Sequence, residues 1–199
     1  MKPLILTDID GVIIQWQSAL SYFALKHNLP IDRIIQVLTS EEFVSPSDLF
    51  NCSDEEGKKL IELYNSSDFI RYLAAYRDAL IVINRMKHTY DFIGVTALGT
   101  SIQTKLNRRF NLNALFPGAF IDIKLCEYND SKSDLLKATR EEYSDRNIVA
   151  YIDDLPNHVD SAAEVLECKI FFMLRGPRSR PKNRHFTVES WFDIESLLK

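Results

Sequence analysis

Two aspartates that follow a short apolar run are the residues of this 199-residue chain best suited to chemistry. Asp8 and Asp10 stand one residue apart at the end of the run Leu4–Ile9, and Gly11 follows them. The run has the length and composition of a buried strand, in which unpaired carboxylates are costly. Glycine lets the backbone turn sharply away from the strand end. A divalent cation and a phosphate ester would offset the negative charge, so the pattern predicts metal-assisted phosphoryl chemistry.

Each of the two carboxylates has a role in such chemistry. Asp8 would attack phosphorus and form an aspartyl phosphate, which divides a very slow hydrolysis into two easier steps. Asp10 would protonate the leaving oxygen and then deprotonate the attacking water. Mg²⁺ is the expected cation because it prefers oxygen ligands, and its charge would keep Asp8 ionised. The alternative interpretation is a surface loop that carries two solvated acids.

Thr96 ends a second apolar run, Phe92–Thr96. A hydroxyl and successive backbone amides at a strand end can hold phosphoryl oxygens, so Thr96 is a candidate phosphate ligand. The alternative is a loop in which Thr100 or Ser101 only caps the next helix.

Lys132 opens a helical pattern over Ser133–Tyr143. Its ammonium group would neutralise phosphoryl charge and hold Asp8 in place. Lys124 competes for this role, and a solvated surface lysine is the ordinary alternative.

A second pair of acids, Asp153 and Asp154, stands at the end of the apolar run Ile148–Asp153. One carboxylate of this pair should complete a metal site with Asp8 and Asp10, and Asp153 is the better candidate. Asp154 would then position a metal-bound water or the Lys132 ammonium. Capping of the next helix is the alternative role for Asp154.

Five apolar runs of strand length alternate with helical patterns over most of the chain. The expected strands are Leu4–Ile9, Phe92–Thr96, Phe120–Leu125, Ile148–Asp153 and Lys169–Leu174, and the expected helices are Asp78–Lys87, Ser101–Phe110, Ser133–Tyr143 and Val159–Leu166. This alternation predicts an α/β fold with a doubly wound, Rossmann-like parallel sheet. Ligands bind such sheets at the carboxyl ends of the strands, where Asp8, Thr96 and Asp153 stand.

The segment 15–76 departs from this alternation because it shows helical periodicity without a convincing strand. Helix starts are predicted at Thr39–Glu42 and Ser53–Glu56, where a hydroxyl residue precedes a glutamate by three positions. We therefore predict an all-helical cap over 15–76, inserted into a core of residues 1–14 and 77–199. The cap aromatics could stack on a nucleobase, but their spacing favours the interior of the cap; they are Trp16, Phe23, Phe43, Phe50 and Tyr64.

The composition excludes several classes of protein. A formal net charge of −4 does not indicate a protein that binds polyanions or a membrane surface. The first apolar run is short and leads into acids, so we expect neither a signal peptide nor a membrane span. Cys52, Cys126 and Cys168 lack paired metal-ligand spacing, which favours a reducing compartment. We therefore expect a cytoplasmic protein.

The candidate residues resemble the motifs of the haloacid dehalogenase superfamily, which includes phosphotransferases with an aspartate nucleophile. Four parts match in chain order: Asp8–Gly11, Thr96 at a strand end, Lys132 before a helix, and Asp153 with Asp154 after a strand. The resemblance implies a Rossmann-like core, dependence on Mg²⁺, an aspartyl-phosphate intermediate and a helical cap of the C1 type. Dehalogenases of the superfamily lack the second carboxylate of the first motif, so Asp10 favours phosphate transfer over dehalogenation.

A finer resemblance is to the 5′(3′)-deoxyribonucleotidases and related phage or bacterial nucleotidases. It rests on Asp10–Ile13, on the pair Asp153 and Asp154, and on the ending Asn183–Trp191, which looks like their Asn-bearing loop and Ser-Trp helix start. The chain departs from them around Thr96, where their usual Thr-Ser-Pro-like continuation is replaced by Thr-Ala-Leu. The resemblance implies a mononucleotide substrate.

One basic run lies near the end of the chain and contains Arg175, Arg178, Arg180, Lys182 and Arg184. It could clamp a second phosphate or a nucleic acid end. Aromatic residues do not interleave with these charges, so stacking on a single strand is poorly supported. A solvated loop is the interpretation that the sequence favours.

The sequence thus favours a Mg²⁺-dependent phosphatase that acts on a small phosphorylated substrate, with a mononucleotide as the first candidate. The cap would close over the substrate and exclude water. A non-catalytic binding or accessory protein of the same fold is one alternative, although the retained Asp10 counts against it. A phosphatase acting on polynucleotide ends is the other, and only the basic run supports nucleic acid as a partner.

Overall fold

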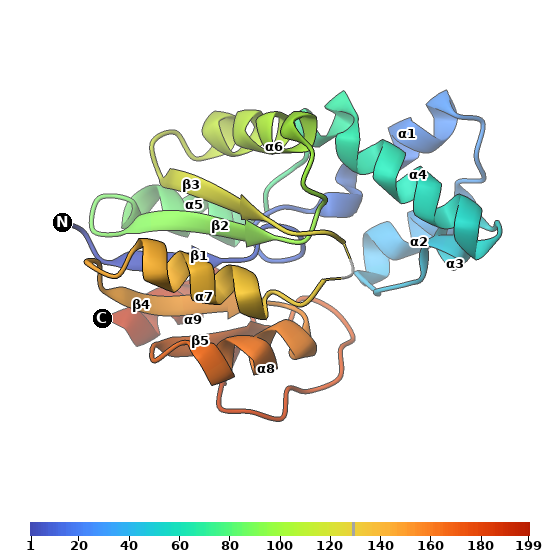
Figure 1. Cartoon of the computed structure of the whole chain (residues 1–199). Coiled ribbons are helices and arrows are strands. Elements are labelled where there is room, and N and C mark those ends of the chain that lie inside the picture. The colour runs from blue at the N-terminus through green and yellow to red at the C-terminus, as the bar shows by residue number, and fades with distance from the viewer. Residues whose placement is uncertain (129) are drawn as a thin grey trace.

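A computed structural model describes residues 1–128 and 130–199 as an α/β core with helices inserted after the first strand (Figure 1). Six parallel strands form one sheet in the order β3-β2-β1-β4-β5-β6. The strands are β1 (Leu4–Thr7), β2 (Asp91–Thr96), β3 (Phe120–Leu125), β4 (Ile148–Asp153), β5 (Lys169–Met173) and β6 (Phe186–Val188). The predicted α/β fold with a Rossmann-like parallel sheet is therefore confirmed.

The central strand β1 pairs with β2 on one side and with β4 on the other. The strand order reverses at this point, because β2 and β3 extend the sheet one way and β4 to β6 the other. A crevice outside the carboxyl ends of the strands at such a reversal is where open α/β sheets bind ligands. The topology therefore places the ends of β1, β2 and β4 around one candidate binding site.

Helices cover both faces of the sheet, and side chains of β1 alternate between the two sides. Leu6 packs into one buried cluster with Leu136 and Val159 of the front helices. Ile5 joins the opposite cluster, which contains Trp191. The core helices are α5 (Arg77–Met86), α6 (Ile102–Leu115), α7 (Ser133–Glu142), α8 (Pro156–Val165) and α9 (Trp191–Leu198). None of the helices in the described part of the chain is both long and apolar enough to cross a bilayer.

The inserted cap consists of helices and lies beyond one end of the sheet (Figure 1). Its helices are η1 (Trp16–Ala19), α1 (Leu20–Lys26), α2 (Asp32–Ser40), α3 (Pro46–Phe50), α4 (Asp54–Ser66) and η2 (Asp68–Tyr72). The chain leaves and re-enters the core at one place, because Gln15 N donates to Ala74 O and Tyr76 N donates to Ile13 O, each at 2.9 Å. Two adjacent linkers therefore join the cap to the core.

The two predicted cap-helix starts had different outcomes. Ser53 caps α4, with its hydroxyl accepting from the Glu56 amide and the Glu56 carboxylate accepting from the Ser53 amide, so this prediction is confirmed. The start predicted at Thr39–Glu42 is wrong, because α2 ends at Ser40 and Glu41 adopts a left-handed φ of +53°. The buried face of that helix lies before Thr39, at Ile34 and Val37, so the hydroxyl residues stand at its carboxyl end.

The last strand, β6, was not among the predicted strands. It has three residues at the edge of the sheet, and Phe186 and Thr187 are exposed. A strand this short has no apolar run long enough to predict it. The pairing with β5 defines it instead.

Trp191 is the largest fully buried side chain of α9 and allows a test of the core. Its indole N–H donates to Val12 O at 3.1 Å, and its ring packs against Phe92. Trp191→Ala is expected to lower the free energy of unfolding by about 3–5 kcal/mol, because a large buried side chain is lost. The neighbouring Phe192 is 46% exposed, so Phe192→Ala should change this free energy by less than about 1 kcal/mol. Equal losses in urea titrations would contradict the burial of Trp191.

Candidate active site

Asp8 lies directly after β1, at the carboxyl end of the sheet. Its backbone N–H donates to Ile152 O of the neighbouring strand β4 at 2.8 Å, which holds the residue in line with the sheet. Its side chain is buried, and Oδ1 accepts from the Ile9 amide at 2.7 Å. Oδ2 lies 2.9 Å from the Lys132 ammonium. The carboxylate is therefore held at both oxygens.

Lys132 bridges two acids from neighbouring strands. It is the N-terminal cap residue of α7 and is fully buried, with Nζ 2.9 Å from Asp8 Oδ2 and 2.8 Å from Asp153 Oδ2. Burial disfavours its charge, but the two carboxylates outweigh burial and raise the pKa of Lys132. The competing candidate Lys124 instead forms ion pairs with Asp122 and Glu142. The structure thus brings together the predicted nucleophile and the predicted lysine.

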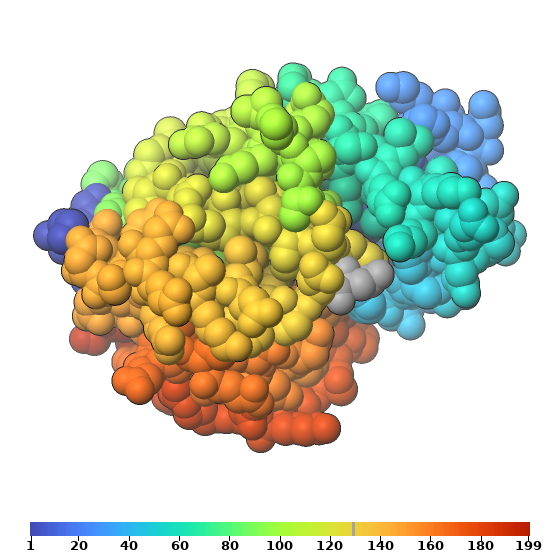
Figure 2. Space-filling model, viewed as in Figure 1, coloured from blue at the N-terminus to red at the C-terminus, as the bar shows by residue number. Residues whose placement is uncertain are grey.

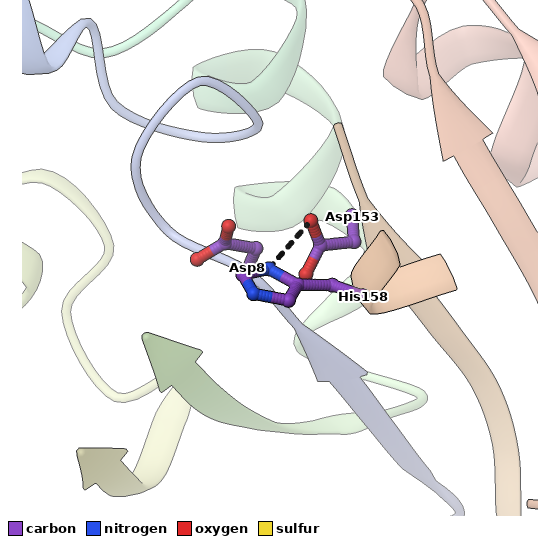
Figure 3. A group of neighbouring side chains, drawn as sticks. All are labelled: Asp8, Asp153 and His158. Carbon is purple, nitrogen blue, oxygen red and sulfur yellow. Dashed lines mark ion pairs between the residues drawn. The ribbon is translucent and has the colours of Figure 1, made fainter. Parts of the chain in front are cut away.

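Asp153 ends β4 and is surrounded by donors. Its Oδ2 accepts from Lys132 and from the Tyr151 hydroxyl at 2.5 Å, and its Oδ1 accepts from the Leu155 amide at 2.9 Å. His158 Nδ1 lies 3.5 Å from Oδ1, as Figure 3 shows. Burial favours the neutral form of Asp153, but the charges of Lys132 and His158 prevail and lower its pKa.

The Asp154 side chain points in a different direction from the Asp153 side chain. It lines the cavity beside Asp8, and its Oδ2 lies 3.1 Å from Arg178 Nη2. Burial and the charge of Asp153 raise the pKa of Asp154 to about 6, although Arg178 opposes this. The two acids therefore lie the other way round from the prediction. Asp153, the expected metal ligand, contacts Lys132, whereas Asp154, which was expected to position a water or Lys132, faces the cavity.

Asp10 is paired with an arginine from α6. Arg108 is fully buried, and its Nη2 lies 2.6 Å from Asp10 Oδ1 and 2.7 Å from Oδ2. The Thr96 hydroxyl, at the end of β2, donates to Asp10 Oδ2 at 3.3 Å. Burial raises the pKa of Asp10 despite the opposing charge of Arg108. A raised pKa suits a carboxyl group that must give and take a proton.

Four residues of the site had no individual role in the prediction from the sequence: Arg108, Tyr151, His158 and Arg178. Arg108 stands in an amphipathic helix, and Tyr151 in an apolar strand, where each has an ordinary explanation. In the sequence Arg178 is one of several similar basic residues. Arg108 is placed by its contact with Asp10 and Arg178 by its contact with Asp154, and these acids lie far away in the chain, so the contacts leave no local pattern. Tyr151 contacts Asp153, two residues along the same strand.

The basic run is only partly the solvated loop that the sequence favours, because Arg180, Lys182 and Arg184 are exposed whereas Arg175 and Arg178 are half-buried. Arg175 pairs with Asp78 at 2.8 Å, and Arg184 donates to backbone carbonyl groups of Leu166 and Cys168. Arg178 reaches the cavity and also donates to Glu41 O of the cap at 3.0 Å. These three arginines have partners within the chain because the loop folds back onto both the core and the cap.

A cavity of about 520 Å³ lies between the cap and the carboxyl ends of the strands. Its core wall includes Asp8, Asp10 and Thr96, and its cap wall includes Phe43 and Leu49. Figure 2 shows the cap helices, in blue to teal, packed against the end of the core where this cavity lies. The acids therefore face a space that the cap partly encloses.

The donor set around the cavity fits a divalent cation. Four carboxyl groups and three cationic side chains meet there, namely Asp8, Asp10, Asp153, Asp154, Lys132, Arg108 and Arg178. When all are ionised, a phosphate dianion would enter a site that is already net negative, and a divalent cation removes this repulsion. Asp8, Asp153 and His158 each place one ligand atom within 4.8 Å of the other two. Carboxylate oxygens from Asp8 and Asp154 face the cavity and suit Mg²⁺.

Comparison with known proteins gives a sequence relative and several structural neighbours. The chain is 52% identical over 198 residues to an uncharacterised 32.4 kDa protein of the gp30–rIII intergenic region of Enterobacteria phage T4, with 100% of this chain and 70% of the phage protein covered. The chain belongs to the family of this phage T4 protein. No family model matches the chain.

Solved structures similar to this member of the phage T4 family are haloacid dehalogenase-like hydrolases. One from Streptococcus pneumoniae has a TM-score of 0.67 at 12% identity, covering 100% of this chain and 99% of that one. The magnesium-bound hydrolase YfnB of Bacillus subtilis has a TM-score of 0.66 at 16% identity, covering 99% and 98%. A predicted phosphatase from Clostridium acetobutylicum has a TM-score of 0.61 at 13% identity, covering 100% and 97%. The predicted haloacid dehalogenase fold is therefore confirmed.

A substitution at Gly11 tests whether Asp154, which faces the cavity, takes part in cation binding. Its φ is +79°, and a Cβ placed on it would lie 2.6 Å from Asp154 Oδ2. Gly11→Ala should therefore displace Asp154 and weaken Mg²⁺ binding, measured by calorimetry, by roughly 10-fold or more.

Gly118 is the matched control for Gly11→Ala. Its φ is +73°, and a Cβ there would meet nothing within 4 Å. Gly118→Ala imposes similar backbone strain, so it should lower stability while leaving Mg²⁺ affinity unchanged. Equal loss of Mg²⁺ affinity in both variants would show that Asp154 does not bind the cation.

The raised pKa of Asp154 predicts a pH dependence of cation binding. With a pKa of about 6, this carboxyl group takes up a proton as the pH falls through 6, and the proton then competes with Mg²⁺. Burial also raises the pKa of Asp8, the other carboxyl group proposed to hold the cation, so the Mg²⁺ association constant should fall by up to about tenfold per pH unit for each of the two groups that takes up a proton as the pH is lowered. Calorimetry across this range checks the prediction, and an association constant that stays level down to about pH 5 would contradict it.

Proposed function

We propose that this protein is a Mg²⁺-dependent phosphatase that hydrolyses a small phosphomonoester through an aspartyl phosphate on Asp8. The observation that carries the proposal is the buried Lys132 ammonium, 2.9 Å from Asp8 and 2.8 Å from Asp153. A nucleophilic carboxylate beside a fixed positive charge, at the carboxyl end of a parallel sheet, suits attack on an anionic phosphorus centre.

The first half of the reaction forms a bond between Asp8 and phosphorus. Asp8 Oδ attacks the phosphoryl group, and the bond from phosphorus to the leaving oxygen breaks. Lys132 offsets the charge that gathers on the phosphoryl oxygens, and the Thr96 hydroxyl stands at the same strand ends. Mg²⁺ held by Asp8 and Asp154 would neutralise phosphoryl charge and keep Asp8 ionised. Asp153 maintains the position of Lys132.

Asp10 completes the reaction as acid and base. Asp10 first gives its proton to the leaving oxygen. It then accepts a proton from the water that attacks the phosphorus of the aspartyl phosphate. This second attack releases inorganic phosphate and restores Asp8. Some neighbours in structure are L-2-haloacid dehalogenases. A halide leaves without a proton, whereas an alkoxide needs one, so the half-buried Asp10 with its raised pKa favours an ester substrate.

The cavity favours a small substrate with an aromatic leaving group, and a mononucleotide is the first candidate. The cavity volume of about 520 Å³ lies within the usual range for ligand sites, about 300–1,000 Å³. Trp16 and Phe43 of the cap segment line it, whereas Phe23, Phe50 and Tyr64 are buried inside the cap. A base could thus lie among apolar cap side chains while its phosphate reaches Asp8.

Asp8→Asn tests the proposed nucleophile. The wild-type protein should release inorganic phosphate from phenyl phosphate and from nucleoside 5′-monophosphates when Mg²⁺ is present. Asp8→Asn should lower kcat by at least roughly 10³-fold, because an amide cannot form the phosphoenzyme. Asp134 is 95% exposed on α7, so Asp134→Asn is the control and should retain wild-type kcat.

Other outcomes of this experiment would favour the alternatives. Retained turnover in Asp8→Asn would exclude Asp8 as the nucleophile. Mg²⁺ binding without turnover of any ester would favour a non-catalytic binding protein of the same fold. Oligonucleotides with terminal phosphates, added to the same panel, test the polynucleotide alternative, for which strong salt dependence is expected.

A further inference from the structure

His158 is a buried ring at the site to which the proposed reaction gives no role. It lies in the first turn of α8, is 5% exposed and lines the cavity. Among the described residues, its Nδ1 has no hydrogen-bond partner. Asp153 Oδ1 is 3.5 Å away, beyond the usual range of about 2.7–3.2 Å for such a bond. A buried nitrogen without a partner is costly, so this atom is a candidate for ligand binding.

The turn between β4 and α8 fixes the position of His158. Asp153 ends the strand, and Leu155 is the N-terminal cap residue of the helix that begins at Pro156. Proline suits this first helical position because its fixed φ matches the helix and its missing N–H is not needed there. The His158 amide donates to Leu155 O at 3.1 Å, which closes the turn. One short segment therefore presents both the carboxylate of Asp153 and the ring of His158.

Asp8 completes a group of three possible metal ligands. Asp8, Asp153 and His158 each offer one atom, and the three atoms lie within 4.8 Å of one another (Figure 3). Two ligands bound about 2.1 Å from a tetrahedral ion lie about 3.4 Å apart. The separation of 3.5 Å between Asp153 Oδ1 and His158 Nδ1 is close to this value. A spacing that is too long for a hydrogen bond thus suits two ligands of one ion.

The charges at these residues also favour a cation. Lys132 Nζ contacts Oδ2 of both Asp8 and Asp153, so two carboxylates and one ammonium leave one negative charge beside the ring. Each carboxylate oxygen has more than one lone pair, so it can bind an ion while it accepts from Lys132 or from a backbone amide. A divalent ion would offset the remaining buried negative charge.

The ring nitrogen distinguishes this group from the position proposed for Mg²⁺. Mg²⁺ prefers oxygen ligands and keeps several waters, whereas imidazole suits first-row transition ions such as Fe²⁺, Ni²⁺ and Zn²⁺. Asp154, the second acid proposed to hold Mg²⁺, pairs with Arg178 and not with His158. The two positions therefore have only Asp8 in common.

We infer that Asp8, Asp153 and His158 form a binding site for a first-row transition ion of the Zn²⁺ class, which binds there more tightly than Mg²⁺. The nitrogen of His158 supplies this selectivity, and the two carboxylates supply the charge. The inference goes beyond the proposed function, because binding of the ion does not require turnover of any ester.

Calorimetric titrations with Zn²⁺ and with Mg²⁺ test the site. The wild-type protein should bind Zn²⁺ at least about tenfold more tightly than Mg²⁺. His158→Gln removes the ring nitrogen, so it should weaken Zn²⁺ binding by roughly 10- to 100-fold. The Mg²⁺ affinity of this variant should change by less than about threefold. His88 is exposed, so His88→Gln is the matched control and should leave both affinities unchanged.

The same titrations contain the results that would overturn the inference. Equal Zn²⁺ affinity in the wild type and in His158→Gln would exclude the ring as a ligand. Equal losses of Zn²⁺ and Mg²⁺ affinity in His158→Gln would show that the ring has only a structural role. Asp154→Asn separates the two positions, because it should weaken Mg²⁺ binding by roughly tenfold or more and leave Zn²⁺ binding in place. Loss of Zn²⁺ binding alone in Asp154→Asn would contradict the ligand set.

Nitrogen resonances of the wild-type protein give a test that does not need a folded His158 variant. The chain has four histidines, and substitutions of the other three, His27, His88 and His185, assign the resonances of His158 in ¹⁵N-labelled protein. We expect Zn²⁺ to shift the Nδ1 resonance of His158, because the ion binds a ring nitrogen directly. A shift confined to another histidine, or no imidazole shift in protein saturated with Zn²⁺, would overturn the inference. Neither result depends on phosphatase activity, so the proposed function stands or falls separately.

Discussion

The site depends on the buried ammonium of Lys132, which lies between Asp8 and Asp153. Removing a lysine and two carboxylates from water is costly, and the cost is offset only when the charges are close and hydrogen-bonded. Neighbouring parallel strands meet this requirement, since β1 and β4 end side by side and the amino end of α7 supplies the lysine. Tyr151 and the Leu155 amide complete the hydrogen bonds of Asp153.

Two more acids of the site each have a separate cation, and both cations come from outside the strands. Arg108 of α6 holds Asp10, while Arg178 of the loop before β6 holds Asp154. Arg178 also donates to the cap backbone at Glu41. The charge around the cavity and the position of the cap are therefore linked through a single side chain, so a change at Asp154 acts on the cap contact as well.

Most of the fold and part of the site could be predicted from local patterns. Apolar runs predicted the five longer strands. Lys132 was expected to act on Asp8, and its ammonium lies 2.9 Å from that carboxylate. Short-range patterns failed where the same residues serve two purposes, as at Thr39–Glu42, which ends a helix although it has the residues of a helix start. Short-range patterns also could not distinguish Arg178 from the neighbouring arginines, because its ion pair with Asp154 depends on the path of a loop.

The sequence by itself determined the sheet, the strand-end position of the acids and the insertion of helices after β1, because apolar runs and helical periodicity depend on a few neighbouring residues. Only the tertiary structure decided that Asp153 contacts Lys132 while Asp154 faces the cavity, and that Arg108 holds Asp10. The physical reason is that adjacent carboxylates on a strand end point in different directions. Which partner each one meets depends on elements that lie far away in the chain.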